Sequence, residues 1–479
     1  MSPGTRPGSP AIPFDAAGET ALAPAQEVAD RALEVAGPGA CTVVVEERSE
    51  CEVRFANNAT TTNGRRRDRR VTVIRFVEHD GGTAVGTASA SGVGDVAEIV
   101  AAAERDAAGT PPAEDASKLI DAGAPPGFDE PPEMVGLGPL ADVVGGLGEA
   151  FRRARAEGRV LAGFAASASV TSYLASSTGT RRRHVQPSAS LQLVGRSGDG
   201  ASSAWAGSGA EELSASSLAA LEDRVAERLV WSTRRVELPA GRYEVLLPPD
   251  AVADLILVLA EALSGRDAED GRSVFSRPGG GTRVGERLSA LAFELASDPG
   301  APGLRCAPFL VAESSGADVS VFDNGAALGP TSWIAAGRLQ RLRYHRAGAT
   351  RAGVPFTPPV DNLSLALPGA SATLGEMVGR SERCLLLTCL WYIREVDLAT
   401  LLLTGLTRDG VYLVEGGEVV AAVNNFRFNE SPVDLLGRVG EVGASERALS
   451  REWGEWTSRT AMPPLRVGEF NMSSVSPAS

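Results

Sequence analysis

The sequence contains very little histidine and almost no lysine. His79, His184 and His345 are the only histidines among 479 residues, and Lys118 is the only lysine beside the many arginines. The histidines lie far apart in sequence, and none adjoins a cluster of acidic or thiol side chains. A hydrolytic zinc site usually needs three protein ligands and an open position. We cannot assemble such a site from these residues, so we predict no metal and no cofactor in this chain.

Cysteine is also sparse, and the cysteines follow no metal-binding or redox spacing. An odd number of cysteines without a CxxC pair is typical of reduced, intracellular thiols. We therefore expect a cytoplasmic protein in which Cys41 and Cys51 are buried free thiols, although two neighbouring strands could bring these two close together. The five cysteines are Cys41, Cys51, Cys306, Cys384 and Cys389.

Long apolar runs and charged tails are missing too. No apolar run reaches the roughly 18 residues that span a bilayer, and the Pro/Gly/Ser-rich start lacks the pattern of a signal peptide. The net charge of −14 is spread along the chain, which argues against nucleic acid as the main partner. The run Arg65–Arg70 lacks interleaved aromatic residues and a basic surround, so we interpret it as a solvated strand end. We expect neither nucleic acid nor a membrane as a partner.

Several catalytic patterns are not found. No GxSxG sequence surrounds a candidate serine, and Cys389 lies in an apolar run where a thiol is usually inert. The glycine run Pro278–Gly281 lacks the GK[ST] ending of a phosphate-binding loop. We therefore predict no catalytic residue in this chain, and whether it acts as an enzyme is left open.

What the sequence does contain indicates a two-domain α+β protein. A chain of 479 residues is too long for one ordinary core. We expect an N-terminal domain with an antiparallel sheet and flanking helices, and then a β-rich C-terminal domain. The predicted bounds are a disordered tail at 1–24, the two domains at 25–236 and 237–470, and a frayed tail at 471–479.

Local patterns predict the elements of the first domain. Gln26–Ala36 is expected to form a helix, and Thr42–Glu46 is expected to pair with Cys51–Ala56 as two strands. Asp80-Gly81-Gly82 predicts a hairpin between Val71–Val77 and Thr83–Ser89.

In the second domain, Ala251–Leu263 and Arg287–Leu295 are expected to form helices. Near the C-terminus, Val411–Val414 and Val419–Val423 are β-branched and apolar, and a glycine-containing turn joins them as a hairpin. An uncovered edge of this hairpin could accept an extended peptide as a further strand, or the hairpin could simply complete a sheet.

Three motifs in order resemble the TldD/PmbA (TldE) family. They are Val53–Asn58 near the N-terminus, Asp361–Gly369, and Asn425-Phe426-Arg427-Phe428-Asn429-Glu430-Ser431 after the C-terminal hairpin. Known members of this family pair a zinc metalloprotease subunit with a related, metal-free subunit. The resemblance covers about Gln26 to Arg438.

In the TldD half of the family, a helix carries a His-Glu-x-x-x-His motif whose glutamate acts as general base toward a zinc-bound water. At the matching place this sequence has Ala260 and Gly265 where the two histidines would be, and neither has a side-chain donor atom. Glu261 remains where the glutamate would be. Without a metal, we expect Glu261 to be an exposed or salt-bridged helix residue and not a base, and we keep it as a candidate substrate contact.

The other candidate substrate-binding residues come from the C-terminal region. Arg394 interrupts an apolar run, so its charge needs a partner. Arg394, Arg408 and Arg427 could each form a structural ion pair with Asp397, Asp409 or Glu430, or could face a chamber and bind a peptide carboxylate or carbonyl. Asn425, at the start of the C-terminal signature, is a further candidate.

The resemblance implies a non-catalytic, TldE/PmbA-like subunit of a heterodimeric TldD/TldE-type metallopeptidase. Its partner would be a TldD-like HExxxH subunit that carries the zinc, and its substrate an unfolded peptide or a modified-peptide precursor. This chain would close the chamber and help to hold the extended peptide. Two alternatives stay open, an accessory subunit of a biosynthetic metalloenzyme and a stand-alone binding homodimer.

Overall fold

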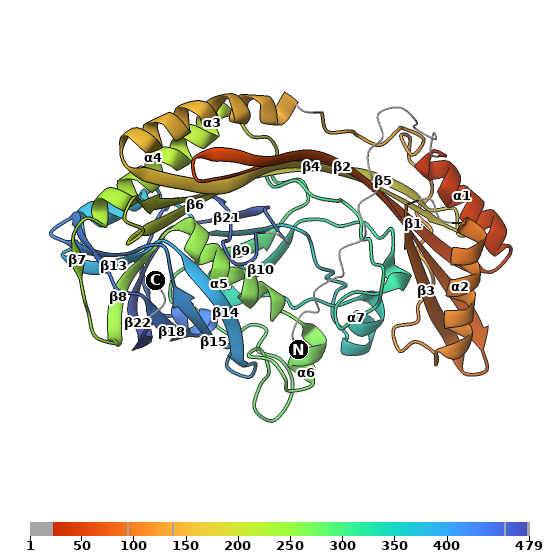
Figure 1. Ribbon diagram of the computed structural model, residues 1–479. Helices are drawn as coiled ribbons and strands as arrows, with labels where there is room; N and C mark the ends of the chain where they lie inside the picture. Colours follow the sequence, from red (N-terminus) through yellow and green to blue (C-terminus); the bar gives the residue numbers. More distant parts are fainter. Residues whose placement is uncertain (1–22, 93–94, 137, 455–456, 477–479) are drawn as a thin grey trace.

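The structure is a computed structural model that describes residues 23–92, 95–136, 138–454 and 457–476. Its N-terminal half is built on an antiparallel sheet of six strands in the order β3-β2-β1-β4-β5-β6. The sheet is arched, and Figure 1 shows the C-terminal half lying under its concave side. The strands are β1 (Ala40–Ala56), β2 (Ala59–His79), β3 (Gly82–Ser91), β4 (Arg159–Ser176), β5 (Arg181–Ser197) and β6 (Ser203–Ala210).

Four helices cover the convex face of this sheet, α1 and α2 at one end and α3 and α4 at the other (Figure 1). Alternate residues of β1 explain the arrangement, because Cys41, Val43 and Val45 pack against α1 and α2. Further along β1, Val53 and Phe55 pack against α3 and α4. The helices are α1 (Ala25–Ala36), α2 (Val96–Gly109), α3 (Gly138–Ala156) and α4 (Ala215–Trp231).

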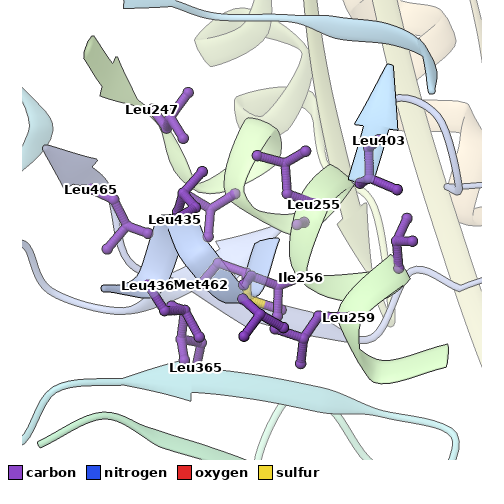
Figure 2. Packing of buried hydrophobic residues seen from close by; sticks show 14 of the residues in the cluster. Leu247, Leu255, Ile256, Leu259, Leu365, Leu403, Leu435, Leu436, Met462 and Leu465 are labelled. Atoms are coloured by element: carbon purple, nitrogen blue, oxygen red, sulfur yellow. The ribbon is translucent and has the colours of Figure 1, made fainter. Parts of the chain in front are cut away.

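The C-terminal half contains two further sheets with one helix between them. The described strands form a sheet of ten, with the path β14-β15-β18-β22-β8-β13-β16-β17-β7 and β19 beside β22, and a sheet of six, β11-β10-β9-β12-β21-β20. Helix α5 (Pro249–Glu261) is buried along almost its whole length. Leu255, Ile256 and Leu259 belong to one apolar cluster with residues of both sheets (Figure 2). A helix that is apolar nearly all round is stable only inside such a core.

The strands of the ten-stranded sheet come from distant parts of the chain: β7 (Arg235–Val236), β8 (Gly241–Leu247), β13 (Arg383–Leu387), β14 (Leu390–Asp397), β15 (Leu402–Thr407), β16 (Val411–Glu415), β17 (Glu418–Val423), β18 (Phe426–Glu430), β19 (Val439–Val442) and β22 (Leu465–Val475). The other sheet contains β9 (Glu294–Ser297), β10 (Thr331–Ala335), β11 (Arg338–Leu339), β12 (Leu363–Ala366), β20 (Glu446–Ala448) and β21 (Thr460–Met462). Short helices complete this half: α6 (Gly265–Glu269), α7 (Arg346–Ala352), α8 (Leu374–Gly379), α9 (Pro432–Leu436) and the 3-10 turn η1 (Val321–Asp323).

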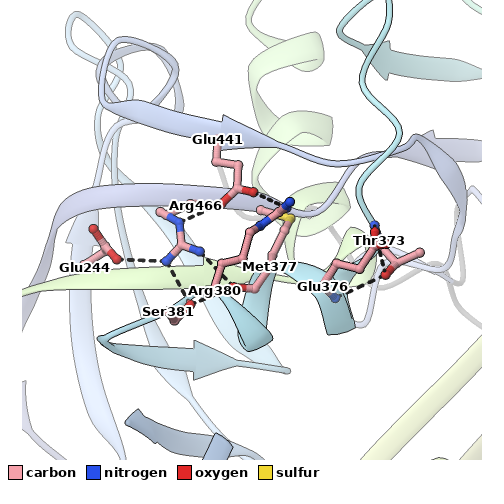
Figure 3. A network of polar contacts seen from close by, with 8 residues as sticks. All are labelled: Glu244, Thr373, Glu376, Met377, Arg380, Ser381, Glu441 and Arg466. Atoms are coloured by element: carbon pink, nitrogen blue, oxygen red, sulfur yellow. Dashed lines mark hydrogen bonds and ion pairs between the residues drawn. The ribbon is translucent and has the colours of Figure 1, made fainter. Parts of the chain in front are cut away.

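A polar network fastens helix α8 to the ten-stranded sheet. Arg466 donates to Glu244 and Glu441 at 2.9 Å each, and to the main-chain oxygen of Met377 at 2.9 Å (Figure 3). Thr373 and Glu376 form a capping box at the start of the helix. Because one guanidinium satisfies several acceptors in fixed directions, it fixes the helix orientation better than a single ion pair would.

Most predicted elements are confirmed, and the α+β class is confirmed. Two expectations about elements are wrong. Thr42–Glu46 and Cys51–Ala56 are not paired strands but parts of the single strand β1, which pairs with β2 and β4 along its length. Residues 287–293 form no helix, because Leu288 and Ser289 donate their backbone N–H groups to the Gly337 carbonyl oxygen.

The ends of the chain also need comment. The predicted frayed tail at 471–479 begins too early, since β22 continues to Val475 and pairs with β18 there. Residues 1–22 and 477–479 lie outside the described residues, as does most of the predicted N-terminal tail. All five cysteines are free and buried, as expected for Cys41 and Cys51. Within the described residues, no helix combines the length and the apolar character needed to cross a membrane.

Candidate functional site

A cavity of about 890 Å³ lies between the concave face of the N-terminal sheet and the C-terminal half. Strands β1, β4 and β5 form one wall, and the end of α5 with loops of the C-terminal half forms the other. Two further contacts join the halves outside the cavity lining. In one, Ile74 and Phe76 pack on Val321 and Phe322, and in the other Arg447 donates to the Gly209 carbonyl oxygen at 2.5 Å.

The wall formed by β1 is charged. Glu46, Arg48, Glu50, Glu52 and Arg54 all line the cavity, because every second residue of a strand points to the same face. Arg48 pairs with Glu50 at 3.0 Å, and Arg54 pairs with Glu52 at 3.3 Å. This alternation of charge gives a wall that is polar without a strong excess of either sign.

The opposite wall is partly apolar. Phe309, Val319 and Trp333 line the cavity, and the Trp333 indole N–H donates to the Ser297 hydroxyl at 2.9 Å. The His184 ring, from β5, meets Phe309 edge-on with ring centres 6.4 Å apart. Burial lowers the pKa of His184, so this imidazole is neutral near pH 7. The cavity therefore has one charged wall and one partly apolar wall.

The end of helix α5 brings Glu261 to the cavity, next to Arg343. The Arg343 guanidinium lies 3.6 Å from the Glu261 carboxylate and 3.0 Å from the Asp318 carboxylate, and it donates to the Glu261 carbonyl oxygen at 2.5 Å. The Arg343 side chain is 12% exposed, whereas that of Glu261 is 78% exposed. Burial raises the pKa of Asp318, and the Arg343 charge opposes that shift. Glu261 is thus the movable member of this cluster and Arg343 the fixed one.

A second ion pair lies on the cavity wall. Arg459 pairs with the Asp361 carboxylate, and its Nε donates to the Asp361 carbonyl oxygen at 2.9 Å. Burial raises the pKa of Asp361, while Arg459 and His184 counteract that rise. Asn362, the next residue, is held by bonds to the carbonyl oxygens of Asp298 and Leu304. The predicted motif Asp361–Gly369 therefore positions an acid–guanidinium pair at the site.

The residues at the end of α5 do not fit a zinc ion. Ala260 and Gly265 carry no donor atom, and a Cβ built on Gly265 would lie 2.1 Å from Cζ of Tyr344. The Tyr344 ring is fixed, because its hydroxyl donates to Glu269 at 2.8 Å. No side chain can therefore enter at position 265 unless the ring moves. In the part of the chain that the structure describes, no three histidine, cysteine, aspartate or glutamate side chains are grouped so as to hold a metal.

Of the predicted substrate-binding residues, Glu261 lines this cavity, but Arg394, Arg408, Asn425 and Arg427 are not among the described residues that do so. The four lie on or beside the ten-stranded sheet. Their role in peptide binding therefore stays a prediction, one that would need a second surface.

The expected ion pair of Arg394 is wrong in its partner. Arg394 binds Glu452 at 2.8 Å, not Asp397, Asp409 or Glu430, and its guanidinium also lies 4.3 Å from the centre of the Tyr392 ring. The choice of Glu452 depends on a loop that follows β20, so no local pattern could have shown it.

The other three candidates make local contacts. Arg408 lies 3.8 Å from Asp409, its neighbour in sequence, and Arg427 donates to the Thr404 hydroxyl at 3.3 Å. Asn425 accepts a long bond of 3.5 Å from the Thr407 hydroxyl. The edge of the hairpin β16–β17 is covered in part, because β7 pairs with β17 at Ala422 and Val423. Peptide addition at the rest of this edge stays a prediction.

Sequence reasoning missed Arg343, Arg459 and the charged face of β1 as parts of the site. The alternating charges of residues 46–54 were a usable signal, since a two-residue period puts them all on one side of a strand. Arg343 gave no such signal, because it is 82 residues away from Glu261 in sequence and meets it only in the folded chain.

Comparison with known proteins agrees with this geometry. A family model described as the PmbA/TldA metallopeptidase C-terminal domain matches residues 240–474. The C-terminal half of the chain is therefore a PmbA/TldD-type domain. The match begins at β8 and includes α5 and α6. Ala260 and Glu261 at the end of α5 and Gly265 at the start of α6 are therefore part of the PmbA/TldD domain. A comparison with curated protein sequences finds no match.

Solved structures extend the likeness beyond the matched PmbA/TldD domain. TldE from Thermococcus kodakarensis has a TM-score of 0.74 at 16% identity, with 93% of this chain and 99% of that chain covered. A putative modulator of DNA gyrase from Thermotoga maritima gives 0.72 at 17% identity, with 93% and 99% covered. A similar protein from Bacteroides thetaiotaomicron gives 0.72 at 14% identity, with 94% and 99% covered. Both halves of the chain therefore have the fold of these relatives.

Proposed function

We propose that this chain is the metal-free, TldE/PmbA-like subunit of a two-subunit metallopeptidase. A TldD-like HExxxH partner would supply the zinc and the hydrolysis. This chain would close the chamber and help to hold an extended peptide or a modified-peptide precursor. The two would work in the cytoplasm, where unpaired thiols such as these five remain reduced.

The observation that carries the proposal is the end of helix α5. The PmbA/TldD domain keeps a glutamate there, Glu261, but Ala260 has no donor atom and the Tyr344 ring blocks position 265. The nearby cation is a guanidinium, that of Arg343, which cannot activate water as a Lewis acid does. Chemistry at this place would therefore have to come from a second chain.

The cavity supports the second part of the proposal. Its charged β1 wall and its apolar wall around Trp333 could contact alternate side chains of an extended peptide. Because Glu261 is mostly exposed while Arg343 is fixed, a peptide carboxylate could displace Glu261 and bind Arg343. Glu261 would then compete with the peptide for Arg343 and would not act as a base.

The direct test is reconstitution. The chain is purified alone, and separately with a TldD-like HExxxH chain, and each sample is dialysed, analysed for zinc and assayed with an unfolded peptide. We expect a complex on size-exclusion chromatography, with zinc and hydrolysis in the complex only. Stoichiometric zinc retained by this chain alone, or hydrolysis without the partner, would contradict the proposal.

Matched substitutions separate the roles of the two chains. Changing the motif glutamate of the partner to glutamine should abolish hydrolysis, because that residue is the base. Glu261→Gln in this chain should leave kcat within about twofold and act on KM alone, if it acts at all. If Glu261→Gln abolishes turnover, this chain contributes to the chemistry and is not an accessory subunit.

The same samples decide between the remaining alternatives. A complex that acts on a modified-peptide precursor but not on unfolded protein would indicate a biosynthetic role. A homodimer that binds peptide and ignores the partner would indicate a stand-alone binding protein.

A further inference from the structure

Half of strand β2 has no strand on its outer side. β1 pairs with β2 from Ala59 to Phe76, whereas β3 pairs with it only from Arg70 to His79. Among the described strands, none pairs with the outer side of residues 59–69, and only at its end does the Gly92 N–H donate to the Arg69 carbonyl oxygen, at 2.8 Å. This leaves an edge of about ten residues, or roughly 33 Å, at strand spacing. Residues 59–66 are all exposed, and the Arg65 side chain donates to the Val135 carbonyl oxygen at 3.4 Å.

The open edge is rich in arginine, in a chain whose net charge is −14. The run Arg65–Arg70 contains five arginines and one aspartate. Arg69 and Arg70 pair with the carboxylates of Glu47 and Glu313, and Arg67, which is one-third exposed, lies 3.8 Å from Glu47. The Arg66 side chain is 48% exposed and pairs with Asp68 of its own strand. Exposed pairs of this kind stabilise a protein little, so an incoming carboxylate can compete for the guanidinium.

The edge continues the charged wall of the cavity. Arg66 lies opposite Glu50, and Asp68 lies opposite Arg48, in the ladder between β2 and β1. Glu50 and Arg48 line the cavity, so Arg66 and Asp68 share its face of the sheet. A strand added beside β2 would place every second side chain on this same face. A peptide bound at the edge would therefore have half of its side chains on the cavity side of the sheet.

We propose that the outer edge of β2, residues 59–69, binds an extended acidic peptide segment as an added strand. Backbone bonds to the edge would give affinity independent of sequence, and the arginines would select carboxylate side chains. A second copy of this edge is a poor occupant, because an antiparallel pair would set one arginine run beside another. This proposal rests on the proposed function only in taking a peptide as the substrate.

The test uses the full chain alone, without a zinc partner. The probe is a fluorescein-labelled decapeptide of alternating glutamate and valine, compared with one in which lysine replaces glutamate. Fluorescence anisotropy should show that the acidic peptide binds and that the lysine peptide binds about tenfold more weakly, or less tightly still. Added NaCl should weaken the binding of the acidic peptide. Hydrogen exchange should slow at residues 59–69 when the acidic peptide binds.

Two controls test the strand geometry and the charge. Peptides N-methylated at the odd or at the even residues lose alternate donors, and one of the two should bind about tenfold more weakly than the other. The variant R65E/R66E/R67E should lose binding of the acidic peptide. The control R31E/R152E/R272E carries the same change of charge on distant, exposed arginines and should keep it.

Each other outcome overturns the proposal. Absence of binding, equal binding of the lysine peptide, or protection only at another strand would each exclude an acidic-peptide site on β2. Protection of residues 59–69 that rises with protein concentration without peptide would show that a second copy occupies the edge. Because no partner or zinc is present, these results do not depend on whether the complex hydrolyses peptides.

Discussion

The middle and the end of helix α5 place carboxylates in opposite surroundings. Asp254 is fully buried, and its Oδ1 accepts from the Ser450 hydroxyl at 2.6 Å and from the Glu452 N–H at 3.0 Å. Glu261, about two turns later, is 78% exposed at the cavity. One helix thus carries a buried carboxylate that is hydrogen-bonded to a loop and an exposed carboxylate that lines the cavity.

This difference shows how the fold separates stability from binding. Asp254 fixes the loop after β20, and its main-chain oxygen also accepts from the Trp453 indole N–H at 2.9 Å. That loop supplies Glu452 to Arg394, and residues 454 and 457–459 to the cavity wall. The buried middle of α5 therefore shapes the cavity indirectly, while its exposed end lines the cavity directly.

The largest effect should come from the apolar part of α5. Leu255 is 1% exposed in the cluster that joins both C-terminal sheets (Figure 2). Leu255→Ala should lower the free energy of unfolding by about 2–5 kcal/mol, since it leaves a cavity in that core. Urea denaturation measures this change. Leu398→Ala, at a side chain that is 53% exposed, is the control and should change stability by less than about 0.5 kcal/mol. Equal effects would show that α5 is not the centre of the core.

The next effect concerns pH. Burial raises the pKa of Asp254 to about 8, against the opposing hydrogen bonds from Ser450 and Glu452. Between about pH 4 and 8 the folded state therefore holds a proton that the unfolded state has lost, so this group makes stability fall as pH rises, by up to about 1.4 kcal/mol per pH unit. Below pH 4 and above pH 8 its contribution is constant.

Asp254→Asn tests this slope, because an amide does not titrate in that range. The measurement is the free energy of unfolding from pH 5 to 8, and the expected result is a flatter slope in the variant. Its absolute stability can change as well, since the new NH₂ group is buried, so only the slopes are compared. Parallel slopes would show that Asp254 titrates normally. Glu261→Gln, at the exposed end of the helix, is the control and should leave the slope unchanged.

A smaller effect on stability is expected at Gly265, the first residue of α6, which lies against Tyr344. Gly265→Ala should destabilise the protein by about 1–3 kcal/mol, because its Cβ would overlap the Tyr344 ring. Gly375→Ala, where nothing lies within 4 Å of the new Cβ, should be neutral or slightly stabilising. Thermal unfolding gives both values. In a Tyr344→Ala background the added effect of Gly265→Ala should largely vanish, and additive effects would exclude the overlap.

The sequence predicted elements whose evidence is local. The hairpin at Asp80–Gly82 depends on neighbouring residues alone. The prediction divided β1 in two, at a place where the strand carries the charged residues Glu46, Arg48 and Glu50. Those charges face a cavity, and a cavity is a tertiary feature that a local pattern does not contain.

The candidate site was predictable only in part, for a related reason. Glu261 was found through a resemblance, whereas Arg343 and Arg459 reach the cavity from loops far away in the chain. The sequence also did not show that the Tyr344 ring occupies the space beside Gly265, because the absence of a histidine does not reveal which group fills that space. A sequence shows that a metal-binding side chain is missing, but only the structure shows which group occupies the space that this side chain would fill.

The smallest effect concerns Arg394, where the structure favours an ion pair over a ligand contact. Its side chain is 53% exposed and pairs with Glu452, which is 7% exposed and also accepts from the Tyr392 N–H at 2.8 Å. A double-mutant cycle of Arg394→Ala and Glu452→Ala should give a coupling of about 0.2–1 kcal/mol, as is usual for exposed pairs. Glu452→Ala alone should be the more damaging change, because it also removes the acceptor of Tyr392. If Arg394→Ala instead weakens peptide binding without coupling to Glu452, the arginine belongs to a binding surface and not to the frame that α5 supports.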